Sequence, residues 1–361
     1  KTPFYRVVSS IALEGESFEG EWRAVEGSRY FQSPVLYKEN GFKKKEDAQK
    51  LICELSTQQP LICTVEKIER KKENKNPPLL FNLAELQNVC SKLFKISPDE
   101  TLSIVQDLYE KKLVTYPRTD ARVLSTAVAK EIYKNISGLR NYPQAGEAAQ
   151  GALELGAYKN IAKTRYTNDK QITDHYAIIP TGQGLGALKG LSLTAQRVYE
   201  TIVRRFLSIF YPPAVYQKVS LVTKMENESF FSSFKVLLSE GYLKIAANSF
   251  AKKSMAEASG KTPESEGEGE VSCDEALLAA LQKLKKGDIL NINGLGIKEG
   301  ETSPPKRYNS GSMILAMENA GQLIADEDLR SQIKGSGIGT SATRAELLKK
   351  LFNIRYLSMH K

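Results

Sequence analysis

The hydrophobic periodicity of this chain changes twice, and this constrains its fold more than any other feature of the sequence. Residues 1–75 are rich in β-branched and aromatic side chains, with one helical pattern at 44–55, which predicts strands around a short amphipathic helix. From residue 80 the apolar side chains recur at helical spacing, and over 214–245 they alternate with polar ones. We therefore predict a mixed α and β fold in which a β-rich domain contains a helical insertion.

Charged and proline-rich stretches divide the chain into five segments. Residues 70–78 form a charged connector closed by two prolines, and residues 252–272 are rich in Ser, Glu, Gly and Lys without apolar periodicity. The predicted segments are the first part of a β-rich domain (1–78), a helical insertion (79–200), the second β-rich part (201–250), a flexible loop (251–275) and a mostly helical domain (276–361).

Two helix starts in the insertion follow from local capping signals. Asn82 can cap one helix, and Ser97, followed by a proline at the first helical position, can cap the next; each has a Glu three residues later. The second helix must end near Leu113, because Pro117 disfavours helical backbone at the residue before it. Tyr116 is therefore expected in an extended stretch directly after a capped helix.

The charge and composition of the chain indicate which binding partners it suits and which metal sites it can form. The chain carries 51 Lys and Arg against 42 Asp and Glu, a formal net charge of +9, which favours a polyanionic partner, with nucleic acid ahead of an anionic membrane. No apolar run approaches the roughly 18 residues of a transmembrane helix. The 4 Cys contain no closely spaced pair and there are only 2 His, so we predict no metal ligands and a reducing, cytoplasmic setting.

The stretch from Tyr116 to Arg118 is the first candidate for chemistry. Side chains two residues apart in an extended segment leave the same face, so the phenol and the guanidinium should project together. This pair suits transesterification of a phosphodiester, in which the phenol oxygen attacks phosphorus and the arginine neutralises the non-bridging oxygens. The alternative, from the residues alone, is a tyrosine and an arginine packed at a domain surface.

Several stretches form an ordered set of motifs along nearly the whole chain. The stronger ones are 77–83 with 108–110 and 114–120, then 173–181 and 337–345; the weaker ones are 18–22 and 304–308. The set resembles the active-tyrosine region, the histidine motif and the glycine-rich motif of type IA DNA topoisomerases, most like the bacterial topoisomerase III branch. The resemblance implies a toroidal clamp, with a β-rich arch, a helical insertion that carries the tyrosine, and a mostly helical domain.

The resemblance also implies roles for three residues. Tyr116 would attack one DNA strand and form a 5′-phosphotyrosyl bond, Arg118 would hold the scissile phosphate, and His175 would lie near that phosphate and assist proton movement or phosphate contacts. From the residues alone, His175 is an ordinary structural hydrogen-bonding residue, whose ring Asp174 could orient. The implied activity is ATP-independent strand cleavage, strand passage and religation.

The glycine-rich motif has physical features of its own. Gly335, Gly337 and Gly339 let backbone amides approach a ligand closely, and Thr340 or Ser341 is placed to cap a helix whose N-terminus favours phosphate. Many ordinary loops and helix starts look similar, so the pattern alone is weak. With the resemblance, we predict a groove for the backbone of single-stranded DNA.

Five residues of the two C-terminal motifs are the predicted DNA contacts. Thr340, Thr343 and Arg344 come from the glycine-rich motif, and Arg344 is expected in the first turn of the following helix. Lys306 and Arg307 lie in a proline-bounded segment and are further candidate phosphate contacts. The alternative for these two is solvated surface charge.

One expected part of the family pattern has no match in the sequence. The family carries an N-terminal TOPRIM domain with acidic residues that hold Mg²⁺, whereas the only Asp-x-Asp arrangement here is at 326–328. We therefore expect a fragment that binds no metal itself, depends on Mg²⁺ through the absent domain in the full-length enzyme, and binds single-stranded DNA as a monomer. On its own it is expected to be inactive or to cleave feebly.

Other classes of function remain as alternatives. A non-catalytic single-stranded DNA-binding clamp would share every feature except a working tyrosine. A conjugative relaxase needs a His-x-His metal cluster, which two isolated histidines cannot supply, and a tyrosine recombinase needs a different set of Arg and His residues. The absence of a GxxxxGK[ST] phosphate-binding loop agrees with an enzyme that uses no nucleotide.

Overall fold

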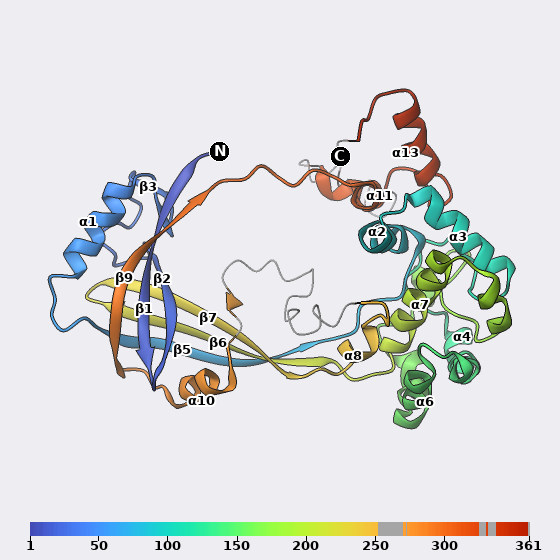
Figure 1. The fold of residues 1–361 in the computed structure, drawn as a ribbon, viewed down its shortest axis with the longest axis horizontal. Helices are drawn as coiled ribbons and strands as arrows, with labels where there is room; N and C mark the ends of the chain where they lie inside the picture. The colour runs from blue at the N-terminus through green and yellow to red at the C-terminus, as the bar shows by residue number, and fades with distance from the viewer. Residues whose placement is uncertain (252–269, 272, 325–329, 331–336, 360–361) are drawn as a thin grey trace. The chain divides into compact units, whose positions relative to one another are not determined.

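The chain folds into two compact units, each assembled from separate stretches of sequence (Figure 1). The computed structural model describes residues 1–251, 270–271, 273–324, 330 and 337–359. The β-unit contains Lys1–Lys75, Ala214–Ser239 and Lys252–Lys306, and the helical unit contains Asn76–Pro213, Glu240–Ala251 and Arg307–Lys361. The chain leaves the β-unit after Lys75 and returns at Ala214, and these two residues are paired on neighbouring strands.

In the part of the β-unit that the structure describes, one sheet is accompanied by two short helices. The elements of this unit are β1 (Pro3–Leu13), β2 (Glu16–Arg23), β3 (Leu36–Lys38), β4 (Gly41–Phe42), α1 (Lys45–Leu55), β5 (Ile62–Lys75), β6 (Ala214–Met225), β7 (Glu228–Ser239), β8 (Glu270–Val271), α10 (Glu275–Lys283) and β9 (Ile289–Glu301). The strands follow the order β2-β7-β6-β5-β9-β1, and because β1 also pairs with β2 the sheet closes on itself like a barrel. All of these pairings are antiparallel.

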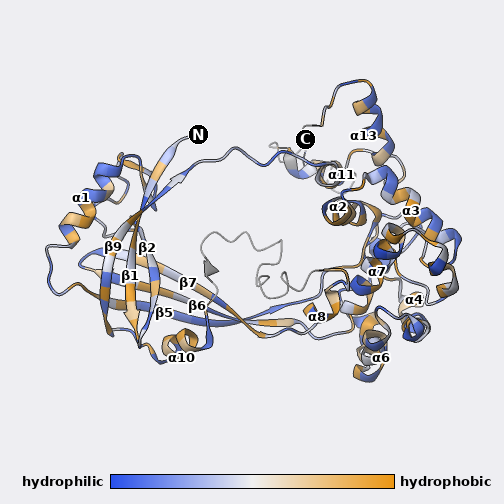
Figure 2. Ribbon diagram, viewed as in Figure 1, coloured by the Kyte–Doolittle hydropathy of each residue, from blue (hydrophilic) through white to orange (hydrophobic). Residues whose placement is uncertain are grey.

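Alternation along the strands creates the core of the β-unit. Buried side chains of β1 (Val7, Ile11) and β6 (Val219, Leu221) belong to one cluster with the fully buried Trp22, while the residues that alternate with them along β1 are only partly buried. Figure 2 shows this mixing of apolar and polar residues along the same strands. α1 and α10 contribute apolar residues to the same core, which closes the fold around it.

The helical unit contains the remaining elements. They are α2 (Leu83–Phe94), α3 (Pro98–Glu110), α4 (Thr126–Glu131), α5 (Tyr133–Gly138), η1 (Leu139–Asn141), α6 (Gly146–Leu155), η2 (Ala157–Lys163), η3 (Asp169–Gln171), η4 (Leu185–Gly190), α7 (Leu193–Ser208), α8 (Leu243–Ala246), α11 (Ser310–Glu318), η5 (Ala320–Leu323) and α13 (Arg344–Asn353). A second large hydrophobic core joins α2, α3 and α7 to the shorter helices. None of the helices among the described residues is both long and apolar enough to cross a bilayer.

The predicted helix starts are confirmed by the cap geometry. The Asn82 side chain accepts a hydrogen bond from the backbone N–H of Glu85 at 2.9 Å, and Ser97 does the same for Glu100 at 3.1 Å. The second helix ends at Glu110, earlier than Pro117 requires. Lys112 adopts a left-handed conformation (φ 61°) and the Leu113 N–H bonds the Leu108 carbonyl at 2.9 Å, which is a glycine-free helix termination.

One glycine allows α11 to lie directly on α2. A Cβ at Gly311 would stand 2.8 Å from the Cα of Asn88 and 2.8 Å from the Cβ of Ser91, so only glycine fits between the two backbones. Ser310 Oγ and Ser91 Oγ lie 3.3 Å apart beside it. A small third cluster, formed by Ala84, Ile314, Met317 and Leu348, then packs α13 against this helix pair.

The unit boundaries differ from the predicted segments. The helical insertion extends beyond residue 200 to Pro213, because α7 buries its apolar face in the helical core. The segment predicted as mostly helical, 276–361, is divided: α10 and the long strand β9 belong to the β-unit, and only Arg307–Lys361 joins the helical unit. Most of the predicted loop 251–275 lies outside the described residues, and β8, within it, pairs with β7.

Candidate nucleic-acid cleavage site

The segment that carries Tyr116 is held beside the histidine motif by a short antiparallel ladder. The N–H of Thr115 donates to the Ile179 carbonyl at 3.0 Å, and Val114 forms a bridge with Pro180. The Thr115 hydroxyl adds a donation to the Ala177 carbonyl at 3.0 Å and accepts from the Ile179 N–H at 3.0 Å. Two motifs that are far apart in sequence therefore form one local structure.

This ladder brings Tyr116 and His175 together. Their ring centroids are 4.3 Å apart with an interplanar angle of 40°, and Tyr109 packs edge-on to Tyr116 at 5.4 Å. The Thr119 hydroxyl donates to the backbone carbonyl of His175 at 2.9 Å, which fixes the histidine backbone from the tyrosine segment. Tyr116 is half-buried and His175 is exposed, so a ligand can reach this pair from solvent.

Arg118 is exposed, but the chain around it is not simply extended as predicted. The N–H of Thr119 donates to the carbonyl of Pro117 at 3.0 Å, which forms a tight three-residue turn centred on Arg118. Among the described residues, none forms a hydrogen bond or an ion pair with the Arg118 guanidinium. A cationic group with five donors is thus presented to solvent two residues from the tyrosine.

The glycine-rich motif contacts the same segment through Arg344. This residue is only 4% exposed, and its Nη1 donates to Asp120 Oδ1 at 3.0 Å. Its Nε donates to the carbonyl of Ile338 at 3.1 Å and its Nη2 to that of Gly339 at 3.2 Å. The guanidinium predicted to contact DNA is therefore engaged within the protein.

Asn82, the N-cap residue of α2, joins Asp120 to Glu318 at the end of α11. The Asn82 amide Nδ2 donates to Glu318 Oε1 at 2.6 Å and to the backbone carbonyl of Asp120 at 3.2 Å. Burial raises the pKa of Glu318 above its ordinary value of 4.5, and Arg344 partly opposes that shift. From the sequence alone, Asp120 receives no role although it ends the motif 114–120, and Glu318 stands in no motif.

The glycines serve protein packing at the positions that the structure describes. Gly337 (φ 59°) lies against the end of α11, where a Cβ would stand 2.6 Å from the Glu318 carbonyl, and the Ile338 N–H bonds the Met317 carbonyl at 2.7 Å. Gly339 has φ 67°. Gly335 lies outside the described residues.

The predicted cap at Thr340 or Ser341 is wrong. The residues 340–343 form a turn, in which the N–H of Thr340 donates to Thr343 Oγ1 at 2.9 Å, and α13 starts only at Arg344 with Thr343 as its N-cap residue. Thr343 makes no side-chain cap bond to the helix. Thr340 and Thr343 are both exposed, and their role as DNA contacts stays a prediction.

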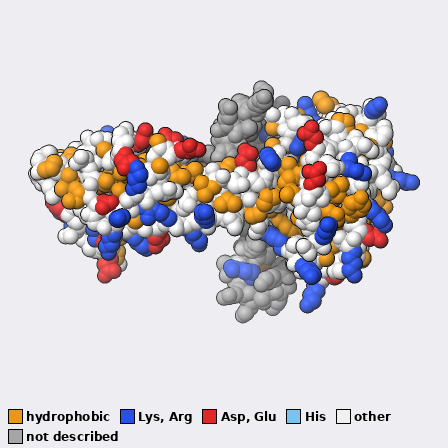
Figure 3. Space-filling model, turned by 90° about the horizontal axis from the view of Figure 1, so that it is seen from below, with side chains coloured by type: hydrophobic (Ala, Val, Ile, Leu, Met, Phe, Trp, Pro, Cys, Tyr) orange, Lys and Arg blue, Asp and Glu red, His pale blue; other side chains and the backbone are white. Residues whose placement is uncertain are grey.

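The other two predicted DNA contacts lie at a unit boundary. Lys306 is the last residue of its stretch in the β-unit and Arg307 is the first of the next stretch in the helical unit; both are exposed. Figure 3 shows Lys and Arg side chains scattered among acidic and apolar ones on the face it presents, without a single dominant basic patch there.

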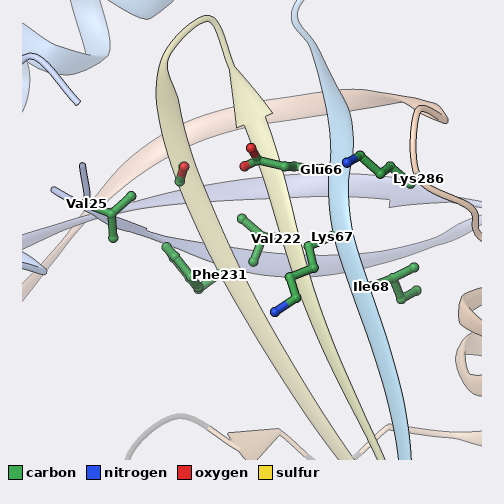
Figure 4. A pocket seen from close by; sticks show the side chains of 8 residues that line it. Val25, Glu66, Lys67, Ile68, Val222, Phe231 and Lys286 are labelled. Atoms are coloured by element: carbon green, nitrogen blue, oxygen red, sulfur yellow. The ribbon is translucent and has the colours of Figure 1, made fainter. Parts of the chain in front are cut away.

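A separate hollow lies in the β-unit, with a cavity volume of 590 Å³ (Figure 4). Its lining residues are Val25, Glu66, Lys67, Ile68, Val222, Ser229, Phe231 and Lys286. Lys67, Val222 and Phe231 are neighbours across three strands, because Lys67 pairs with Val222 and Val222 with Phe231. It has no residue in common with the tyrosine site.

Comparisons with known proteins agree with this arrangement. A model of the family described as DNA topoisomerase matches residues 1–361. DNA topoisomerase 3 of Bacillus licheniformis is 36% identical over 280 residues, covering 76% of this chain and 35% of the relative. DNA topoisomerase 3 of Bacillus subtilis is 32% identical over 308 residues, covering 84% and 39%. The structure of full-length topoisomerase I from Thermotoga maritima is similar at a TM-score of 0.59 and 20% identity, covering 100% of this chain and 48% of that one.

The closed β-sheet, the helical unit and the tyrosine segment have the fold of a type IA topoisomerase, which confirms the predicted fold class. The chain belongs to the DNA topoisomerase family and is topoisomerase III-like. It spans 35–39% of the length of these two curated relatives.

Proposed function

We propose that this chain is the part of a type IA DNA topoisomerase that supplies the nucleophile, and that Tyr116 is that nucleophile. Its phenol oxygen attacks a backbone phosphorus of single-stranded DNA and loses its proton. A new phosphotyrosyl bond forms to the 5′ phosphate of the downstream strand. The bond from phosphorus to the 3′ oxygen of the upstream strand breaks, and that oxygen leaves as a hydroxyl after taking up a proton. One phosphoester replaces another, so religation by the 3′ hydroxyl needs no ATP.

The observation that carries this proposal is the contact of Tyr116 with His175, 4.3 Å between ring centroids, at an exposed surface. A phenol needs a group that accepts its proton and a cation that stabilises the phosphorane-like charge. The histidine lies beside the ring, and the Arg118 guanidinium is exposed two residues along the chain. We assign proton movement or phosphate contact to His175 and charge neutralisation to Arg118.

The proposal extends to partners and cofactor. A net charge of +9 suits a DNA partner, with Thr340, Thr343, Lys306 and Arg307 as backbone contacts, and we propose that the chain acts as a monomer. We also propose a cytoplasmic location, where disulfides are rare, and all 4 cysteines are free thiols. Mg²⁺ is the cofactor that the resemblance implies. Among the described residues no group of three or more His, Cys, Asp or Glu fits a metal ion, so the proposed steps use this chain's side chains alone.

Covalent trapping on single-stranded DNA tests the proposal. An oligonucleotide is labelled at either its 3′ or its 5′ end and incubated with the chain, with and without Mg²⁺ and an added TOPRIM fragment, and the reaction is stopped with denaturant. A 5′-phosphotyrosyl bond predicts that the 3′ label stays on the protein and that the 5′ label appears on a shortened free strand. Tyr116→Phe should abolish the adduct, whereas Tyr109→Phe, a matched change in the neighbouring ring, should leave it.

Two other outcomes contradict the proposal in different ways. An adduct that persists in Tyr116→Phe shows that another residue is the nucleophile. Tight binding of the oligonucleotide with no adduct under any condition supports the alternative of a non-catalytic single-stranded DNA clamp.

A further inference from the structure

Arg344 is the most thoroughly engaged cation near the tyrosine segment. Three of its nitrogens donate to three acceptors on two segments, and 4% of the residue is exposed. Two of the acceptors, the carbonyls of Ile338 and Gly339, belong to the glycine-rich turn, and the third is the Asp120 carboxylate. The planar guanidinium presents its donors from three separate nitrogens in fixed directions, a geometry that the single nitrogen of an ammonium group does not reproduce.

Asp120 lies in the same segment as Tyr116, four residues further along the chain. The carbonyl of the preceding residue, Thr119, accepts from the Leu83 N–H at 3.1 Å, and the Asp120 carbonyl accepts from Asn82 at 3.2 Å. The backbone of Thr119 and Asp120 therefore contacts the start of α2, and the Asp120 side chain contacts Arg344 at the start of α13. The Thr119 hydroxyl meanwhile holds the His175 carbonyl at 2.9 Å. Asp120 is thus linked to Tyr116 along the chain and to His175 through the Thr119 hydrogen bond.

We propose that Asp120 and Arg344 are a positioning pair: they hold the segment that contains Tyr116 and Arg118 against the glycine-rich turn, and Arg344 does so without touching DNA. This rests on the proposed role of Tyr116. The Asp120 side chain is 55% exposed, so the ion pair itself contributes little stability after solvent screening. Its consequence is geometric, because a displacement of about 1 Å can cost about 100-fold in rate.

The chain offers a matched control for this proposal. Lys349 also lies on α13, and its Nζ contacts Asp99 on α3 at 3.0 Å, which is the same distance as the Asp120–Arg344 pair. The side chains of Lys349 and Asp99 are both about half-exposed, and neither residue lies in the tyrosine segment. Asp99→Asn and Lys349→Gln thus remove an ion pair from the same helix without touching the site.

Adduct kinetics separate positioning from DNA contact. The rate of adduct formation is measured across DNA concentrations for Arg344→Lys, Asp120→Asn and the two controls, alongside thermal melting. We expect Arg344→Lys and Asp120→Asn to lower the rate at saturating DNA by about 10-fold or more, with less than a twofold change in the half-saturating concentration. Asp99→Asn and Lys349→Gln should keep the wild-type rate at saturating DNA and the wild-type half-saturating concentration. A raised half-saturating concentration with an unchanged maximal rate would instead show that Arg344 binds DNA.

Hydrogen–deuterium exchange tests the same pair without any activity. The proposal predicts faster amide exchange over residues 113–120 in Asp120→Asn and Arg344→Lys than in Asp99→Asn, at temperatures well below melting. Unchanged exchange in that peptide would overturn the positioning role. A wild-type chain that forms no adduct even with Mg²⁺ and an added TOPRIM fragment would refute the proposed function, while the exchange result still decides the positioning role. Asp120→Asn keeps a half-exposed polar side chain, so it serves if Arg344→Lys fails to fold.

Discussion

The ring centroids of Tyr116 and His175 lie 4.3 Å apart, although the two residues come from separate motifs that are joined by the ladder at Thr115 and by the Thr119 hydroxyl. This contact predicts that the imidazole takes part in the reaction of the phenol. His175→Ala should lower the rate of adduct formation by about 100-fold, the usual scale of a lost acid–base group. Tyr176→Phe, a neighbouring change that keeps the ring, should leave the rate unaltered; equal losses in both variants would mean that the substitutions merely disturb the ladder.

Asn82 joins a helix cap to the polar contacts around Asp120. Its side chain caps α2 at 2.9 Å and also donates to Glu318 at 2.6 Å, whereas Ser97 only caps α3. Ser97→Ala should cost about 1 kcal/mol of unfolding free energy, and Asn82→Ala about 2–3 kcal/mol, because the half-buried Glu318 carboxylate also loses its donor. Urea unfolding measures both, and equal losses would show that the donation to Glu318 adds nothing.

Glu318 makes the helical unit sensitive to pH. Burial raises the pKa of its carboxyl above 4.5, Asp120 adds to the shift, and Arg344, Asn82 and Arg122 oppose it. The folded state therefore binds the proton more tightly than the unfolded state, and the stability from this group is lost as pH rises from about 4.5 through the raised pKa. Glu318→Gln should remove that loss, so its stability relative to wild type should increase between acidic and neutral pH. A pH-independent difference in urea midpoints would contradict this.

Gly311 sets the distance between α11 and α2. A Cβ there would stand 2.8 Å from two atoms of α2, one of them backbone, so Gly311→Ala should destabilise the helical unit by about 1–3 kcal/mol. Gly186→Ala is the comparison, since a Cβ at that position meets nothing within 4 Å. Thermal melting should separate the two variants, and a Gly311→Ala protein as stable as Gly186→Ala would mean that the helices move apart without cost.

Local chemistry made part of this structure predictable. The start of α3 follows from Ser97 and the proline after it, because a cap involves only residues within one turn. The strands of the β-unit follow similarly from alternation. β9 (Ile289–Glu301) was missed: it contains three glycines, which weaken the strand signal, and it is held in place by pairing with β1, far away in sequence.

The site was predictable only where its residues lie close in sequence. Tyr116 and Arg118 stand in one short stretch, and their chemistry can be inferred from their types. The role of Gly337 was inferred as close approach to a ligand, whereas the atom it approaches is the Glu318 carbonyl, a contact that depends on how α11 docks. The ion pair of Asp120 with Arg344 joins distant segments in the same way, so no local pattern reveals it.

Mapping the attachment point tests the central claim most directly. The covalent complex is trapped on single-stranded DNA, digested with nuclease and trypsin, and sequenced by mass spectrometry. Trypsin separates the peptide 113–118, which contains Tyr116, from the peptide 96–111, which contains Tyr109. We predict a nucleotide phosphate on Tyr116 in the first peptide. A nucleotide on Tyr109, or on any peptide other than 113–118, would contradict the account.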